Sequence, residues 1–197
     1  MTDLPFDPLY GFVFAGLFSP GPNVILLTTS GARFGFRPTL PHVLGVAAGV
    51  GVTSGLTALG LGGLLLAQPG LTLVLRLAAA AWILWMAWKL LHAARRQVIS
   101  ETDRPFTFLE AVLFQWVNPK VWAIAVAASA GFPSGLPPIH EALRIASAFA
   151  GINLFVCLFW SFAGGLLTFL LTTQRAWRVF NTSMAAALAL SAAMIFL

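Results

Sequence analysis

The chain has 197 residues, of which 59% are hydrophobic and only 9% are charged. Soluble domains carry about 25% charged residues, because polar side chains must cover most of the surface that faces water. The composition therefore excludes a soluble domain, and it excludes a disordered chain, which combines low hydrophobicity with high charge. We predict an all-α integral membrane protein.

The net charge of +5 does not indicate a nucleic-acid partner, because the basic residues are scattered between apolar runs instead of forming a patch. A single cysteine cannot form an internal disulfide. His42, His92 and His140 lie near the ends of separate segments, with no cluster of cysteines or carboxylates spaced to hold a metal. We therefore expect no metal site and no cofactor.

Six stretches approach the roughly 20 apolar residues that a membrane-spanning helix needs. Barrel strands would alternate in polarity, whereas 56–67 and 121–130 are apolar on all sides. The first ten residues carry Asp3 and Asp7 but no Lys or Arg, so we expect no cleavable signal peptide. The whole chain, 1–197, is then a single transmembrane domain whose predicted segments are 9–30, 40–66, 71–91, 106–130, 145–171 and 179–197.

The basic residues also predict an orientation. Eight of them lie in or beside the first, third and fifth connections, and two lie beside the remaining connections. Because cytoplasmic loops carry the excess of Lys and Arg, both termini are expected outside the cytoplasm. The eight are Arg33, Arg37, Lys89, Arg95, Arg96, Arg104, Arg175 and Arg178, and the two are Arg76 and Arg144.

Six helices divide into two halves of three, and an odd number per half requires that the second half insert upside down. Helix-breaking residues interrupt the first and fourth segments at corresponding places, around Pro20 and Pro119. Interrupted segments at equivalent positions are typical of inverted-repeat transporters with a binding site near the membrane midplane. We therefore expect a 3+3 inverted repeat.

The first interruption is Ser19-Pro20-Gly21-Pro22-Asn23. Each proline lacks an N–H and disfavours helical dihedrals in the residue before it, so the helix is predicted to break here and to restart near Asn23. A break in the hydrocarbon is tolerated only where protein or a wet cavity covers it. The free N–H groups of the second half-helix would attract a carboxylate. The alternative is a proline kink that only shapes the packing.

The fourth segment repeats this logic in Gln115-Trp116-Val117-Asn118-Pro119-Lys120. Pro119 should free the carbonyl of Gln115, and Asn118 adds a donor and an acceptor. Lys120 is roughly 22 Å along the helix from Phe106, so it lies deep in the membrane, where a lysine normally faces a cavity or a partner. Since the segments hold no acidic residue at mid-depth, a substrate carboxylate could be its counter-ion. Alternatively, Lys120 snorkels or rests neutral against backbone carbonyls.

Several other residues receive weaker assignments. Glu110 could carry coupling protons if burial raises its pKa, or it could form an interfacial pair with Lys or Arg of the third connection. Asn153 and Asn181 could line a cavity or bond across helices. Small residues spaced four apart in the second segment, Gly45, Gly49, Gly51 and Gly55, indicate close helix packing, and Trp82, Trp85 and Trp88 indicate an interfacial anchor.

Ser19-Pro20-Gly21-Pro22-Asn23, Gly35-Phe36-Arg37 and Asn118-Pro119-Lys120, in this order along a six-helix chain, resemble the LysE/RhtB family of bacterial amino-acid exporters. Within the family, Pro20–Asn23, Trp82–Lys89 and Phe114–Asn118 look most like the branch associated with cysteine and O-acetylserine export. The resemblance covers essentially the whole chain. It implies a multi-pass protein of the bacterial inner membrane that exports an amino acid or a derivative, driven by the proton gradient. We expect no enzyme, because the sequence holds no paired carboxylates or grouped histidines that could form a catalytic cluster.

On this basis we expect the substrate carboxylate to bind between Lys120 and the half-helix that starts at Asn23. Freed carbonyls and the amides of Gln115 and Asn118 would hold its ammonium group, and rocking of the two halves would alternate access. Protons and the lipid bilayer are the other expected partners, and the oligomeric state stays open. The alternatives are a non-transporting membrane subunit or scaffold, a channel, and an exporter of another small solute.

Overall fold

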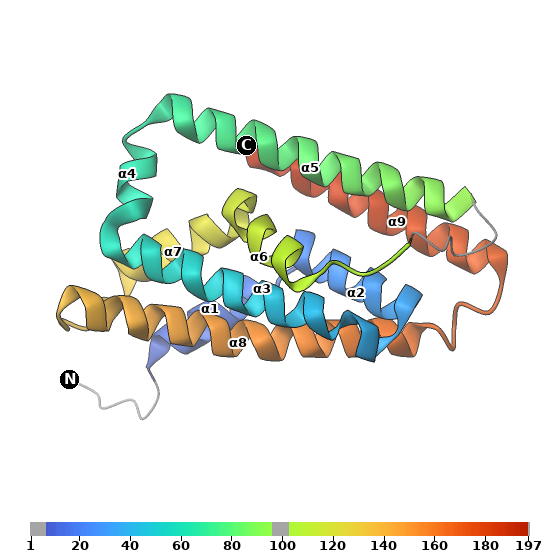
Figure 1. The fold of residues 1–197 in the computed structure, drawn as a ribbon, viewed down its shortest axis with the longest axis horizontal. Coiled ribbons are helices and arrows are strands. Elements are labelled where there is room, and N and C mark those ends of the chain that lie inside the picture. The colour runs from blue at the N-terminus through green and yellow to red at the C-terminus, as the bar shows by residue number, and fades with distance from the viewer. Residues whose placement is uncertain (1–6, 96–102, 197) are drawn as a thin grey trace.

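A computed structural model describes residues 7–95 and 103–196. Within these ranges the regular elements are all helices (Figure 1). They are α1 (Pro8–Phe18), α2 (Pro22–Phe34), α3 (Phe36–Leu56), a π-helical turn (Thr57–Leu61), α4 (Gly62–Leu66), α5 (Pro69–Arg95), α6 (Phe108–Val117), α7 (Pro119–Gly131), α8 (Pro138–Leu167), α9 (Gln174–Ala193) and a 3-10 turn (Met194–Phe196). Asp3, Arg96 and most of the third connection lie outside the described residues.

The predicted interruptions are confirmed. Over the described residues, four helices are long and apolar enough to cross a membrane: Phe36–Leu64, Pro69–His92, Pro138–Leu167 and Gln174–Phe196. Two further spans are bent helix pairs, α1 with α2 at 61° and α6 with α7 at 66°. Together they make up to six crossings, as the hydropathy of the sequence predicts for an integral membrane protein.

Helix ends follow local capping chemistry more than hydropathy. α1 begins where the Asp7 carboxylate accepts the N–H of Leu9 at 2.9 Å, and α6 begins at a capping box between Thr107 and Glu110. The fifth span begins at Pro138, seven residues before the predicted start. Arg144, which suggested a boundary in the sequence, lies inside α8 because its guanidinium pairs with Asp7 and Glu141, both at 2.7 Å.

The second span contains one break that the sequence did not predict. The helix is expected to be continuous over 40–66, but Gly60 has a φ of 103°, which interrupts it before α4. Only glycine adopts this conformation readily, because a Cβ would collide with the following carbonyl. The short α4 then turns the chain away from α3 and leads into α5 (Figure 1).

The two halves of the chain make mirrored contacts. Counted within each half, α3 and α8 are the second spans, and α5 and α9 are the third. α3 packs against α8, and α5 packs against α9. Each broken span packs against the second span of the other half: α1 and α2 against α8, and α6 and α7 against α3. Corresponding elements also run in opposite directions in Figure 1, where α3 and α8 are antiparallel, as are α5 and α9. This is the arrangement expected of an inverted repeat.

Small residues bring the backbones of these helices into direct contact. A Cβ built on Gly31 of α2 would overlap the carbonyl oxygen of Ser161 on α8, and a Cβ on Gly164 of α8 would overlap the carbonyl oxygen of Thr28 on α2. Gly45 of α3 meets the carbonyl of Phe108 in the same way. The close packing predicted for the glycines of the second span is therefore confirmed, and it fixes the broken helices against α3 and α8.

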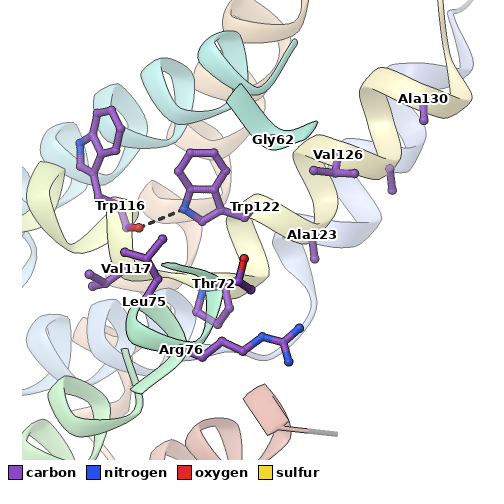
Figure 2. A pocket seen from close by; sticks show the side chains of 12 residues that line it. Gly62, Thr72, Leu75, Arg76, Trp116, Val117, Trp122, Ala123, Val126 and Ala130 are labelled. Atoms are coloured by element: carbon purple, nitrogen blue, oxygen red, sulfur yellow. Dashed lines mark hydrogen bonds between the residues drawn. The ribbon is translucent and has the colours of Figure 1, made fainter. Parts of the chain in front are cut away.

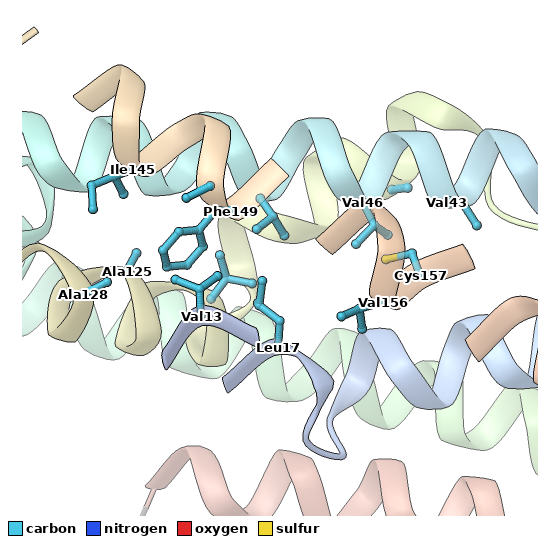
Figure 3. Packing of buried hydrophobic residues seen from close by; sticks show 14 of the residues in the cluster. Val13, Leu17, Val43, Val46, Ala125, Ala128, Ile145, Phe149, Val156 and Cys157 are labelled. Carbon is cyan, nitrogen blue, oxygen red and sulfur yellow. The ribbon is translucent and has the colours of Figure 1, made fainter. Parts of the chain in front are cut away.

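Apolar side chains fill the space around the two breaks. One cluster joins α1, α3, α7 and α8 through residues such as Val13, Val46 and Phe149 (Figure 3). A second cluster joins α5 and α9 to α2 and α6 through Ile83, Leu188 and Phe114. The two breaks lie between these clusters, so packing on both sides holds them in place.

Candidate functional site

The first break is a short extended segment between two helices. α1 ends at Phe18, Gly21 is extended, and α2 begins at Pro22, one residue before the predicted restart. The Gly16 carbonyl, which loses its helical donor to Pro20, accepts the hydroxyl of Ser19 at 2.8 Å. The Ser19 and Pro20 carbonyls have no such local donor, and they are available to a partner from another helix.

The second break lies at Asn118, which is extended between α6 and α7. The carbonyl of Gln115 was expected to be free, but it accepts the backbone N–H of Asn118 at 3.3 Å. The Trp116 carbonyl accepts the indole N–H of Trp122 at 3.0 Å, which is the dashed contact in Figure 2. The acceptors that the break was expected to offer are therefore satisfied locally, and the polar groups left at this break are side chains.

Lys120 joins the two breaks. Its ammonium group donates to the carbonyl of Ser19 at 2.5 Å, to the hydroxyl of Ser19 at 2.9 Å and to the carbonyl of Pro20 at 3.2 Å. A lysine against backbone carbonyls is one of the two arrangements expected from the sequence. These carbonyls belong to the other broken helix, so the contact also closes the gap between the halves of the chain.

Three amide side chains form a second link between the breaks. Asn23 donates to the Gln115 side-chain oxygen at 2.8 Å and accepts from its side-chain nitrogen at 3.3 Å. Asn118 donates to the same Gln115 oxygen at 3.3 Å, and the Gln115 nitrogen also reaches the carbonyl of Ala111 at 2.9 Å. Gln115 and Asn118 are buried and Asn23 is half-buried, so the network lies largely inside the protein.

These residues surround a small cavity, which we call the central cavity. Its volume is about 20 Å³, which is room for about one water molecule. α2 and α7 both begin at its wall, each with a proline in the first turn and no side-chain cap. The lining includes Gly21, Pro22, Asn23, Asn118, Lys120, Asn153, Cys157 and Trp160.

Several lining side chains carry buried polar atoms without a hydrogen-bond partner. They are the side-chain oxygen of Asn118, the side-chain nitrogen of Asn153 and the indole nitrogen of Trp160. Leaving such an atom unpaired costs about 1–3 kcal/mol. The central cavity therefore presents donors and acceptors that a small zwitterion could use when the helices move apart.

The structure brings together almost all of the predicted site residues. Ser19, Pro20, Gly21, Pro22 and Asn23 meet Gln115, Asn118, Pro119 and Lys120 at the two breaks. From the sequence, Asn153 was expected either to bond across helices or to line a cavity, and Trp160 was not singled out. Both residues lie on α8, far along the chain from the two proline motifs. The signal in the sequence that could have identified them is a polar side chain within an apolar span.

Glu110 is separate from this group. Its carboxylate pairs with Arg104 at 2.6 and 2.7 Å, and it accepts the backbone N–H of Thr107 at 2.8 Å. Arg104 belongs to the third connection, so this is the interfacial ion pair that was expected as the alternative to a proton-coupling role of Glu110. Glu110 also caps α6, so it stabilises the start of the second broken span.

Two larger cavities flank the breaks. The inner cavity, about 270 Å³, lies where α2 ends and α6 begins, and its charged or titratable lining residues are Arg33, His42, Lys89, Asp103, Arg104 and Glu110. The outer cavity, about 310 Å³, is mostly apolar and reaches the second break at Pro119, with Arg76, Trp116 and Trp122 in its wall (Figure 2). The orientation predicted from the basic residues places the inner cavity on the cytoplasmic side.

Comparison with known proteins agrees with this architecture. A model of LysE type translocators matches residues 14–197, which is nearly the whole chain. The chain belongs to the LysE type translocator family. The resemblance seen in the motifs is thereby confirmed, and the translocator is an integral membrane protein with helical spans.

The translocator is 28% identical over 194 residues to the cysteine/O-acetylserine efflux protein of Escherichia coli O1:K1 / APEC, in an alignment that covers 96% of this chain and 94% of the relative. A protein of the same name from Shigella flexneri serotype 5b (strain 8401) is 27% identical with the same coverage. No solved structure is significantly similar to the translocator.

The amide link predicts the effect of removing Asn23. In Asn23→Ala, Gln115 loses two hydrogen bonds to the other half of the chain. One neutral hydrogen bond contributes about 0.5–1.5 kcal/mol, so loss of the shorter bond alone corresponds to about three- to tenfold, and we expect solute transport to fall by at least this much at matched membrane levels. Asn181→Ala is the matched control, because Asn181 is a buried asparagine of α9 outside the three described cavities. Equal transport by both variants would contradict a role for Asn23.

Proposed function

We propose that the translocator exports an amino acid or a small amino-acid derivative from the bacterial cytoplasm across the inner membrane by proton-coupled secondary transport. The family supports transport as the general activity, and the names of the relatives support amino-acid solutes. The substrate site is the central cavity at the two helix breaks. The observation that carries this assignment is the reach of Lys120 from one break to the carbonyls of the other.

The chemistry of the central cavity suits a zwitterion. The Lys120 ammonium, the indole N–H of Trp160 and the uncapped N-terminus of α2 are donors for a carboxylate. The carbonyls of Ser19 and Pro20 and the side-chain oxygen of Asn118 are acceptors for an ammonium group. A bound amino acid would thus replace the direct bonds between the two halves.

The size of the central cavity implies that the described conformation is closed. Since about 20 Å³ does not hold an amino acid, binding requires separation of the two breaks toward the inner or the outer cavity. The substrate carboxylate would then take the Lys120 ammonium from the carbonyls of Ser19 and Pro20. Alternation between inner and outer openings follows the rocking of halves that inverted repeats permit.

The test is transport by the purified protein in proteoliposomes. The vesicles are preloaded with a labelled panel of cysteine, O-acetylserine, threonine, homoserine, leucine, lysine and arginine, with and without an imposed pH gradient. We expect flux of one chemical group against its concentration gradient only when the pH gradient is present. Flux that never exceeds equilibration would indicate a channel, and no flux from folded protein would favour another solute or a scaffold.

A further inference from the structure

The inner cavity is lined by charged side chains that already have partners. Arg33 pairs with Asp103 at 2.8 Å, and Arg104 pairs with Glu110 at 2.6 Å. The Lys89 ammonium lies over the ring of Trp85, 4.4 Å from its centroid. Each of these charged groups therefore has a partner inside the cavity wall.

His42 is the exception among the titratable side chains described in this cavity. It is on α3, its exposed fraction is 2%, and neither ring nitrogen has a hydrogen-bond partner within residues 7–95 and 103–196. Its ring packs against Phe106 with a centroid separation of 5.0 Å. A buried imidazole with two unpaired nitrogens is costly unless the cavity supplies a partner in some step of the cycle.

The charges that face His42 come from every element around the inner cavity. Arg33 lies on α2, Lys89 on α5 and Glu110 on α6, while Asp103 and Arg104 precede α6. The Glu110 carboxylate lines the same cavity as the imidazole ring. Glu110 also holds the pKa of the Arg104 guanidinium above its ordinary value, so Arg104 keeps its proton. Imidazole, in contrast, is the side chain that ordinarily changes charge near neutral pH.

We propose that His42 binds the coupling proton of the translocator, in the inner cavity and apart from the substrate site. This inference rests on the proposed function, because it names the residue through which a pH gradient would drive export. One lone pair of the neutral ring takes up a proton that enters from outside and later releases it to the cytoplasm, so charge and atoms balance without another reactant.

The geometry links this proton to the substrate site through two routes. On α2, Leu26 and Thr29 line the inner cavity, and Asn23, one turn before Leu26, lines the central cavity. On α6, the imidazolium would compete with Arg104 for the Glu110 carboxylate at the start of the broken span. Protonation of His42 would therefore loosen the ion pair that closes the inner end of this span.

The first experiment compares His42→Asn with wild type in proteoliposomes that contain the panel solute carried by the wild type. His92→Asn is the matched control, because His92 is outside the inner cavity and its ring contacts the carbonyl of Trp88. We expect the flux driven by a pH gradient to be at least tenfold lower in His42→Asn than in wild type. Solute exchange at equal pH, which moves no net proton, should stay within about twofold of wild type. Gradient-driven flux retained by His42→Asn would overturn the proposal.

The Glu110→Gln variant tests the alternative that Glu110, and not His42, binds the coupling proton. If Glu110 carries the proton, this variant loses the gradient response while His42→Asn keeps it, and the proposal fails. The wild-type arm tests the proposed function separately: a wild type that moves no panel solute, or that ignores the pH gradient, contradicts that function whatever the variants do.

A second measurement leaves His42 intact and so does not depend on how a His42 variant folds. In the double variant His92→Asn, His140→Asn, His42 is the single remaining histidine, and ¹⁵N-histidine labelling gives one imidazole spectrum. We expect that spectrum to change from the neutral to the protonated pattern as the pH falls, with a midpoint that shifts when the transported solute is added. A spectrum that stays neutral throughout, with and without the solute, would overturn the assignment.

Discussion

Replacing Lys120 by methionine should reduce transport by about ten- to hundredfold. Methionine keeps most of the length of the side chain but removes the charge that would bind a substrate carboxylate. A hydrogen bond to a charged group contributes about 1.5–3 kcal/mol, which corresponds to this range in affinity. The variant also loses the three bonds to Ser19 and Pro20, so the two breaks should separate more easily. The measurement is initial flux at several solute concentrations.

The control for this variant is Arg175→Met, which removes an exposed positive charge at the start of α9 without touching the described cavities. Membrane levels and thermal unfolding in detergent show whether either variant is folded. Undiminished transport by folded Lys120→Met would remove Lys120 from the site, and with it the main argument for the central cavity.

The largest effect on stability is expected from Gly164→Ala. The new Cβ would overlap the carbonyl oxygen of Thr28, so α2 and α8 must move apart over the contact that holds the first break. Overpacking ordinarily costs about 1–3 kcal/mol, and here the obstacle is backbone that cannot change rotamer. We expect a drop of several degrees in the unfolding temperature of the purified protein and lower membrane levels.

Gly151→Ala is the matched control in the same helix, because nothing lies within 4 Å of a Cβ at Gly151. Alanine is a better helix former than glycine, so this variant should be neutral or slightly more stable. If the two alanine variants unfold at the same temperature, the close approach of α2 and α8 is contradicted.

The sequence could predict the breaks and their lysine because proline and an intramembrane charge act locally. Pro20, Pro22 and Pro119 remove helical hydrogen bonds wherever they stand, and Lys120 needs a polar neighbour at any depth of the bilayer. The fold class followed from hydropathy for the same reason. These signals do not depend on which other helix lies beside them.

What the sequence could not give depends on contacts between distant residues. Arg144 looks like a helix boundary until Asp7, 137 residues away in the chain, pairs with it. Asn153 and Trp160 approach the central cavity only because α8 packs against α2, and His42 looks like a residue near a segment end until Phe106 covers it. Gly60 is one of 18 glycines, and nothing in its neighbours indicates that it alone among those in the second span takes a positive φ.

The backbone contacts made by the glycines determine which interfaces can yield during transport. Gly31 and Gly164 hold α2 in backbone contact with α8, and Gly45 does the same for α3 and α6. If the helices of either pair slid past each other, their backbones would collide, so each pair moves as a stiff unit. The α5–α9 pair instead meets α2 and α6 through long side chains, including Ile83, Leu188 and Phe114. Such contacts can adjust by a change of rotamer without a collision between backbones. The protein is thus mechanically uneven: each stiff pair carries one of the two breaks, so the breaks can separate between the pairs, and α5 and α9 form a more compliant seam beside them.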